Sequence, residues 1–250
     1  MSRTRVRLLM EYDGAAYSGW QRQPDAHTVQ GAVEEALATI LREPVTVFGQ
    51  GRTDAGVHAE GQAAHADLPG EGHVLERLKR RLNRILRPSC ALLRLDRAPP
   101  DFHARFHAAE RRYRYQVVLR PSPLRHRTYW EVRGPLDEVA IRSLMGAVLG
   151  EHEFGAFCSH SQERAHTRCV VRAFTLEGDG AERTFRIAAD RFLHNMVRRL
   201  VGDLVAVGRG RRPADQVLER LDSPGPARDG LTAPAHGLIL EEVVYPDGPQ

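Results

Sequence analysis

The stretch Gly51–Ala59 reads Gly-Arg-Thr-Asp-Ala-Gly-Val-His-Ala and places one carboxylate, Asp54, between an arginine and a glycine. It follows Val45–Phe48, a run typical of a strand, so Asp54 is expected in a loop at the end of that strand. An aspartate presented in this way, with the cation Arg52 two residues away, is a candidate nucleophile. Glycines on both sides would let the backbone pass close to a bulky ligand. We therefore take this loop as the candidate catalytic centre.

The loop has three other possible interpretations. A dinucleotide-binding fingerprint starting at Gly49 would need a glycine at position 54, where Asp54 would repel a pyrophosphate. An aspartyl phosphotransferase would need a second aspartate where the chain has Gly56. Taken alone, Asp54 could simply be a turn residue that bonds its own backbone. That interpretation is weakened by the neighbouring Arg52 and His58, since opposite charge keeps a carboxylate ionised.

The composition bounds the class of protein. The 250 residues suffice for one large or two smaller domains, and the net charge of +4 is modest evidence for an anionic partner. Lys79 is the only lysine among 36 basic residues; codon bias would explain that excess of arginine but not its clustering. Three cysteines without Cys-x-x-Cys spacing predict neither a disulfide framework nor a zinc site. The chain has no apolar run of membrane-spanning length, which favours a soluble, cytoplasmic protein.

Hydrophobic periodicity predicts an α+β fold. Val29, Val33, Ala36 and Ile40 would form one face of a helix that Thr28 caps. Two further helical faces are Leu75, Leu78, Leu82, Ile85 and Ile141, Leu144, Val148, Leu149; a fourth helix is expected over 194–207, with Gly208 as its stop. Strands are expected at 6–11, 45–48, 62–67, 113–119, 170–176, 184–188 and 238–244. The pattern predicts two similar lobes, residues 1–105 and 106–250, with mixed or antiparallel sheets flanked by helices.

Two clusters combine arginines with aromatic or imidazole rings. In the first, Asp101–Phe106 and Glu110–Tyr115 alternate aromatic residues with arginines. This pattern suits RNA, whose unpaired bases stack on rings and guanidinium planes while phosphates take the charge. The alternative is an exposed strand with Tyr113 and Tyr115 on its core face. In the second cluster His194 and Arg198 are four apart and would share a helix face, while a solvated basic face is the better interpretation of Arg199.

Over nearly its whole length the chain resembles the tRNA pseudouridine synthases of the TruA family. The resemblance rests on the Gly51–Ala59 motif together with other motifs in the expected order. These are Glu11–Gly14, Gly19–Gln23, Phe102–Phe106, Arg111–Tyr115, Gly150–Phe154, 192–202, and an ending that runs from Thr232-Ala233 through Gly237-Leu238 to 245–247.

The resemblance implies the pseudouridine synthase fold with a catalytic cleft between lobes. It also implies isomerisation of uridine to pseudouridine at about positions 38, 39 and 40 of the tRNA anticodon stem-loop, after the base is flipped out of the stack. By the match Asp54 is the nucleophile, Arg198 pairs with it, and Arg52 fills the space that the base vacates. Tyr113 would stack on the flipped base. The residues expected to contact RNA are Phe102, His103, Ala104, Arg105 and Phe106.

No metal, nucleotide or redox cofactor is expected, and the resemblance implies a homodimer with one tRNA lying across both subunits. Two other functions stay open: a non-catalytic tRNA-binding protein on the same fold, and a pseudouridine synthase for a different RNA. The segment Ser159–Arg168 is less regular than the corresponding loop of the family, so its RNA contacts are not assigned. The Arg-rich helix expected within 71–86 has no assigned role.

Overall fold

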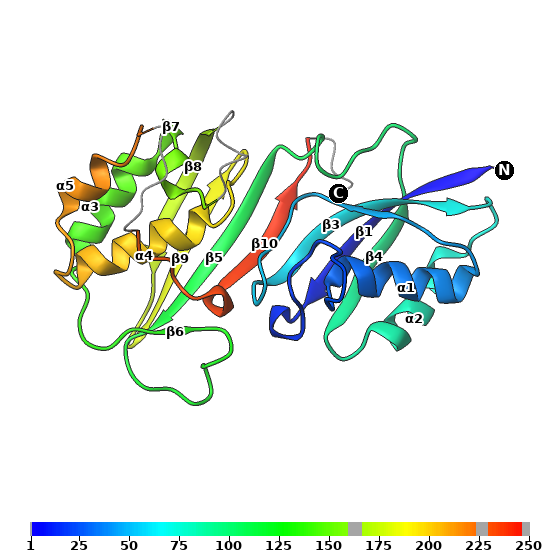
Figure 1. Cartoon of the computed structure of the whole chain (residues 1–250), viewed down its shortest axis with the longest axis horizontal. Helices are drawn as coiled ribbons and strands as arrows, with labels where there is room; N and C mark the ends of the chain where they lie inside the picture. Colours follow the sequence, from blue (N-terminus) through cyan, green and yellow to red (C-terminus); the bar gives the residue numbers. More distant parts are fainter. Residues whose placement is uncertain (1, 160–166, 224–229, 247–250) are drawn as a thin grey trace. The chain divides into compact units, whose positions relative to one another are not determined.

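The computed structural model of the chain (Figure 1) describes residues 2–159, 167–223 and 230–246. The chain divides into two compact units. Unit 1 runs to Ala109 and is joined by the residues from Ile239 onward, and unit 2 runs from Glu110 to Leu238. Each unit contains a sheet and helices, which confirms the predicted α+β class.

Unit 1 is built on a sheet with the strand order β4-β1-β3-β10. Strand β1 is antiparallel to both β3 and β4, β2 pairs antiparallel with β3, and β10 runs parallel to β3. Two helices, α1 and α2, pack on each other, and α2 also packs on β4 (Figure 1). The elements are β1 (Arg3–Tyr12), η1 (Gly14–Ala16), α1 (Val29–Leu41), β2 (Val47–Gly49), β3 (His58–Pro69), α2 (Leu75–Leu86), β4 (Cys90–Arg97) and β10 (Leu238–Val244).

Helix α1 forms as its sequence predicts. The Oγ1 of Thr28 accepts a hydrogen bond from the backbone N–H of Gly31, at 3.2 Å, and so satisfies one of the free donors of the first turn. Val29 and Val33 are fully buried against the sheet. The helix ends at Arg42, whose backbone is left-handed with a φ of 58°.

Helix α2 and strand β4 differ in detail from the prediction. Leu78 and Leu82 are buried as expected, but Ile85 is 48% exposed and Leu86 takes the core position. The i+4 spacing from Leu78 through Leu82 continues to 86 rather than 85. Strand β4 was not predicted, because a bulge in its pairing with β1 puts Leu93 and its neighbour on the exposed side together and breaks the alternation.

Unit 2 has an antiparallel sheet in the order β5-β9-β8-β7, with the short β6 parallel to β5. Helices α3 and α4 pack on each other, and α3 also packs on β8 (Figure 1). The elements are β5 (Glu110–Val118), β6 (Trp130–Glu131), α3 (Glu138–Val148), β7 (Gly150–Glu153), η2 (Gly155–Phe157), β8 (Arg168–Glu177), β9 (Glu182–Ala189), α4 (Met196–Gly208), α5 (Ala214–Leu218) and η4 (Ala235–Gly237).

Three details of the unit 2 helices correct the prediction. Leu149 lies beyond the end of α3 and is 42% exposed. Helix α4 begins at Met196, so His194 precedes the helix and does not share a face with Arg198. The helix ends at Gly208, but close packing explains that glycine: a Cβ there would lie 2.5 Å from Cδ1 of Ile141 on α3. In the part of the chain that the structure describes, no helix is long and apolar enough to cross a membrane.

Candidate active site

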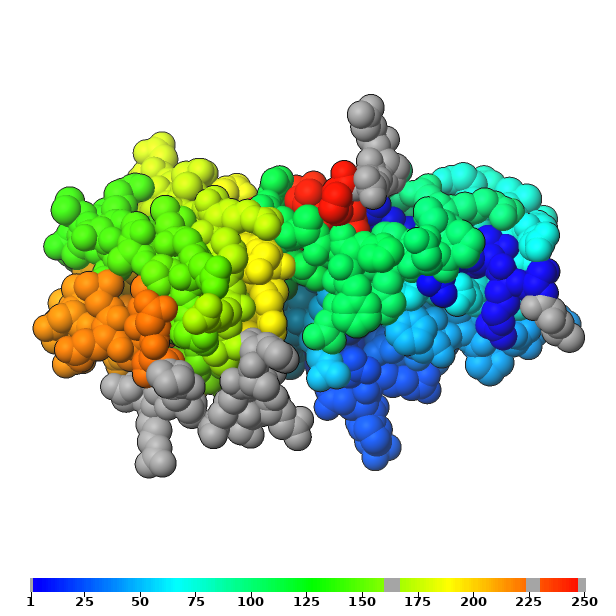
Figure 2. Space-filling view, turned by 90° about the horizontal axis from the view of Figure 1, so that it is seen from above, coloured from blue at the N-terminus to red at the C-terminus, as the bar shows by residue number. Residues whose placement is uncertain are grey.

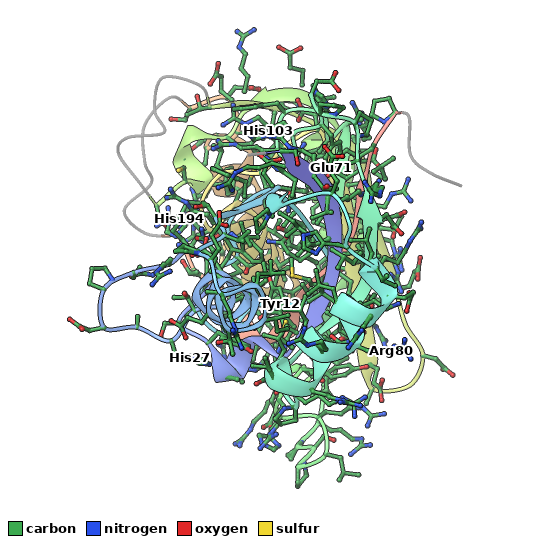
Figure 3. All side chains as sticks on the ribbon, turned by 90° about the vertical axis from the view of Figure 1, so that its right-hand side faces the viewer. Tyr12, His27, Glu71, Arg80, His103 and His194 are labelled. Atoms are coloured by element: carbon green, nitrogen blue, oxygen red, sulfur yellow. The ribbon has the colours of Figure 1, made fainter. Side chains whose placement is uncertain are left out.

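The Asp54 loop joins β2 to β3 in unit 1 and is held by the ends of other elements. Beside Asp54, the hydroxyl of Thr53 lies 2.8 Å from that of Tyr12, the last residue of β1, and both side chains are buried (Tyr12 is labelled in Figure 3). Asp54 itself is half-buried, and Arg52 is exposed. The carbonyl of Asp54 accepts the backbone N–H of Val57 at 3.1 Å, which closes a turn around the carboxylate. The loop is therefore tied to the sheet through the residue next to Asp54.

The segment Gly19–Trp20 forms a second support for the loop. The backbone N–H of Trp20 donates to the carbonyl of Thr53 at 3.0 Å. Gly19 has a φ of +95°, and a Cβ there would lie 2.9 Å from the same carbonyl. The Trp20 ring is buried and packs so closely on Gly49 that a Cβ at Gly49 would lie 2.5 Å from it. Glycine is therefore required at both positions by backbone conformation or by close approach.

The far end of the loop is held by the motif Glu11–Gly14. The backbone N–H of Gly14 donates to Nδ1 of His58 at 3.1 Å, and a Cβ at Gly14 would lie only 2.1 Å from the carbonyl of Val57. Three motifs that are separate in the sequence thus meet around one carboxylate. The Nδ1 of His58 also lies 3.2 Å from Oδ1 of Asp13, and its support of the Asp54 charge stays a prediction.

In unit 2, the guanidinium of Arg198 on α4 is oriented by two acceptors. Its Nε donates to the carbonyl of Ala233 at 2.8 Å, and one terminal nitrogen donates to Oδ1 of Asn195 at 2.7 Å. The N–H of Ala233 returns a bond to the carbonyl of Arg198 at 3.0 Å. Gly202, one turn further on, permits this contact, since a Cβ there would lie 2.0 Å from the carbonyl of Leu231. The Thr232-Ala233 motif therefore serves to hold Arg198.

Tyr113 lies in the middle of β5, paired with Ile187 of β9, and its side chain is only 8% exposed. Its ring meets Phe192 edge to face, with centroids 5.2 Å apart. Tyr115, on the same face of the strand, is fully buried and donates its hydroxyl to the carbonyl of Pro234 at 2.8 Å. Tyr115 is therefore a core residue, while the contact of Tyr113 with a substrate base stays a prediction. The interpretation of Arg199 as part of a solvated basic face fits the structure less well. Its guanidinium donates to the backbone carbonyls of Ala156 and Cys158.

The residues Phe102–Phe106 form a surface loop in unit 1 with both buried and exposed members. Phe102 and Ala104 are buried, and the carbonyl of Ala104 accepts the hydroxyl of Tyr245 at 2.7 Å. Figure 2 shows this segment (green) against the C-terminal strand (red). Phe106 is 74% exposed, and Arg105 is exposed beside it. Phe102 and Ala104 therefore anchor the loop, and Arg105 and Phe106 form its exposed surface.

A cluster of rings continues from this loop. His65 on β3 stacks on Phe48, with centroids 5.1 Å apart, and lies 4.6 Å from His103, which in turn lies 4.3 Å from Phe106 (His103 is labelled in Figure 3). The backbone N–H of Ala104 donates to Nδ1 of His65 at 3.2 Å. Burial, reinforced by the nearby His103 and Arg5, lowers the pKa of His65 to about 4, and burial also lowers the pKa of His103. At neutral pH His65 is therefore an uncharged acceptor.

Known proteins resemble this chain over most of its length. A family model described as tRNA pseudouridine synthase matches residues 8–107 and 144–246. The chain is 42% identical to tRNA pseudouridine synthase A of Myxococcus xanthus, over 98% of this chain and 93% of that protein. The chain belongs to the tRNA pseudouridine synthase family. Two more members are similar at the same level: tRNA pseudouridine synthase A of Hyphomonas neptunium is 43% identical, over 98% of this chain and 99% of that protein, and that of Syntrophotalea carbinolica is 41% identical, over 96% of each.

Membership of the pseudouridine synthase family confirms the resemblance seen in the sequence and the predicted enzyme class. Among solved structures, that of a Cbf5-Nop10-Gar1 complex aligns over 97% of this chain and 58% of that one, with a TM-score of 0.36 and 11% identity. This likeness is too weak to carry an argument.

Sequence reasoning missed the residues that support the site. Tyr12, Gly19 and Ala233 lie within motifs that the sequence displays, but their partners are 41, 34 and 35 positions away. A hydroxyl and a carbonyl that meet only after folding leave no local pattern. Of the segment Ser159–Arg168, residues 160–166 lie outside the described part of the chain, as does position 247 of the C-terminal motif.

Proposed function

We propose that this chain isomerises uridine to pseudouridine in the anticodon stem-loop of tRNA, at about positions 38, 39 and 40. Family membership supports the reaction and the class of substrate. The observation that carries the proposal is the Asp54 loop: Asp54 is half-buried, and two other motifs of unit 1, Glu11–Gly14 and Gly19–Gln23, bond the residues around it. Such fixing of a nucleophile lowers the entropic cost of reaching the reactive geometry.

In the proposed reaction the target uridine leaves the stack, which costs a few kcal/mol. The bond between C1′ and N1 breaks, the base turns, and a bond forms between C1′ and C5. The proton on C5 leaves to solvent, N1 takes up a proton in its place, and the Asp54 carboxylate is regenerated. This balance is the same whether Asp54 attacks C6, attacks C1′ or drives a glycal route. None of these steps calls for a cofactor.

We assign the remaining roles by family resemblance. Arg198 is the counter-ion of Asp54, and its fixing by Ala233 and Asn195 within unit 2 suits a group that must keep one orientation. Tyr113 stacks on the flipped base, as its ring, held by Phe192, is suited to do. Arg52, which is exposed, enters the space that the base vacates. RNA contacts come from His103, Arg105 and Phe106, while the buried Phe102 and Ala104 anchor their loop.

The test uses tRNA with tritium at C5 of uridine, because formation of the new bond releases that tritium to water. Wild type should release it, Asp54→Asn should not, and Asp25→Asn, which alters an exposed acid of the same unit, should match wild type. Replacing uridine by cytidine at positions 38 to 40 should abolish release. Equal release by Asp54→Asn and wild type would remove Asp54 from the mechanism. Binding of tRNA without release by wild type would leave the non-catalytic tRNA-binding protein as the function.

We further propose a cytoplasmic homodimer that holds one tRNA across both subunits. A single chain carries a net charge of only +4, and a second copy doubles the charge offered to the polyanion. Light scattering of the purified protein should give twice the chain mass of 28.0 kDa, with one tRNA bound per dimer. A monomer that retains full activity would contradict this assembly.

A further inference from the structure

Helix α2 is fixed to unit 1 by one side only. Leu78, Leu82 and Leu86 are buried. The Asn83 side chain donates to the carbonyl of Leu92 at 2.9 Å and accepts the N–H of the same residue at 2.7 Å. It thus binds the free edge of β4 as a neighbouring strand would, since β4 is the last strand of the unit 1 sheet. These contacts fix the position of the helix on the sheet and leave its other side exposed.

That other side carries four arginines, Arg77, Arg80, Arg81 and Arg84, which we call the α2 arginine stripe. All four are exposed, and at 100° per residue they occupy an arc of about 100° around the helix axis. Figure 3 labels Arg80 on this helix. The one acid of α2, Glu76, forms an ion pair of 2.8 Å with Lys79. Within the described residues none of the four arginines forms an ion pair, and Arg80 donates its Nε to the backbone carbonyl of Glu76 at 3.4 Å.

The stripe is unfavourable for the helix itself. Its members stand three and four residues apart, where like charges repel. Arg77 also lies in the first turn, where the helix dipole disfavours a cation. Some exposed arginines elsewhere do have acidic partners: Arg142 on α3 pairs with Glu138 four residues earlier, and Arg3 pairs with Glu43. An excess of arginine from codon usage alone would not concentrate four uncompensated charges on one face.

The stripe runs toward the end of the sheet that carries Asp54. Four residues after α2, Cys90 begins β4 and pairs with Tyr12, which pairs in turn with Ala59 of β3, just beyond the Asp54 loop. From β4 to β3 is two strand spacings, about 10 Å. From Arg77 to Arg84 the stripe extends about 10 Å along the helix, with Arg84 at the end nearer to Cys90. RNA bound at Asp54 thus has a cationic track leading away on the same unit.

We propose that the α2 arginine stripe binds phosphates of the substrate tRNA that flank the modified nucleotide. The inference rests on the proposed function and extends it to a contact that the catalytic motifs do not include. Arginine suits this task because its planar fork matches phosphate oxygens, and phosphate contacts position an RNA without reading its sequence. The stripe contributes affinity and orientation and takes no part in bond making.

The test replaces all four arginines by glutamine and measures binding of intact tRNA by fluorescence anisotropy over a range of salt concentrations. A matched control removes four exposed arginines elsewhere, Arg3, Arg133, Arg142 and Arg211, and so carries the same net charge. The stripe variant should bind tRNA about 10- to 100-fold more weakly than wild type near 0.1 M salt. The slope of log K against log salt should become less steep by about 3. The control should stay within about threefold of wild type with an unchanged slope.

Kinetics separate this role from a structural one. At saturating tRNA the stripe variant should release tritium at the wild-type rate, with the loss confined to KM. The four-lysine variant of the stripe keeps the charge and should recover most of the affinity. An active wild type whose stripe variant binds like the control would overturn the inference and leave the proposed function intact. A wild type that binds tRNA through the stripe but releases no tritium would overturn the proposed function and leave the inference about the stripe intact.

Discussion

At the scale of single residues, His65 links the stability of unit 1 to pH. Its folded pKa is about 4, below the 6.5 of an exposed histidine, so between these values the unfolded chain binds a proton that the folded chain does not. Stability therefore falls as the pH falls through this window. Between pH 7 and pH 5 the loss attributable to His65 is about 2 kcal/mol.

Urea denaturation at pH 7 and pH 5 checks this prediction. His65→Gln keeps an acceptor for the N–H of Ala104 but does not titrate, so its stability should fall less than that of wild type by about 2 kcal/mol over this range. His126→Gln, which alters an exposed histidine, should follow wild type. A His65→Gln variant whose loss parallels that of wild type would show that His65 is charged in the folded state.

Single residues also show what a sequence can and cannot reveal about the site. Asp54 is visible because its glycines and its place after a strand are local features. The hydroxyl pair of Tyr12 and Thr53 is not, since their contact exists only once β1 lies beside β3. The same applies to Arg198, whose orientation depends on a carbonyl 35 residues away. A site's chemistry is thus easier to predict from sequence than the contacts that position it.

At the scale of elements, the packing of α4 on residues 231–233 tests how Arg198 is positioned. Gly202→Ala would place a Cβ 2.0 Å from the carbonyl of Leu231, so the segment must move and the bonds from Arg198 to Ala233 must lengthen. We expect a loss of about 1–3 kcal/mol in stability and a large loss of tritium release. The measurements are thermal denaturation and the tritium assay.

Gly146 provides the matched control. It lies exposed in α3, and a Cβ there would meet nothing within 4 Å. Gly146→Ala should therefore stabilise the protein by about 0.5–1 kcal/mol, because alanine favours a helix more than glycine does. Its activity should be that of wild type. If both alanine variants were equally stable and active, the close approach of α4 to Leu231 would have no consequence.

Elements with unbroken periodicity were predicted well. Helix α1 and strand β10 follow their patterns, and the cap at Thr28 was expected from its residue type. Strand β4 was not predicted, because its bulge places two successive residues on one side of the sheet. In α2 the choice between Ile85 and Leu86 depends on which residue faces β4, and two adjacent apolar residues do not settle that from sequence.

At the scale of the whole molecule, unit 1 is made from both ends of the chain. Strand β10 lies along β3, and the backbone comes so close at Gly61 that a Cβ would lie 2.3 Å from the carbonyl of Glu241. Tyr245 then packs under Arg7, whose guanidinium carbon lies 4.3 Å from the ring centroid, and bonds Ala104. Residues 1–109 alone therefore lack a strand and an aromatic anchor of their own unit.

We expect the fragment 1–109 to be unfolded or aggregated, because the free edge of β3 invites pairing with other chains. Residues 238–246 joined to position 109 through a flexible linker of about 10 residues should restore a folded unit, since β10 is about 20 Å long and must be entered from its far end. Circular dichroism and size-exclusion chromatography distinguish the two cases. A monomeric, cooperatively folding 1–109 fragment would contradict the expectation.

The return of the chain to unit 1 at Ile239 also bears on biosynthesis. Between Ala109 and Ile239 the ribosome must make the whole of unit 2, which at ordinary elongation rates takes on the order of 10 s. During that delay unit 1, which contains Asp54, lacks strand β10, while unit 2 is free to fold as it is made. Unit 2 is thus complete in sequence before unit 1, although unit 1 begins first. The unit that carries the nucleophile therefore receives its last strand only after all of unit 2 has been synthesised.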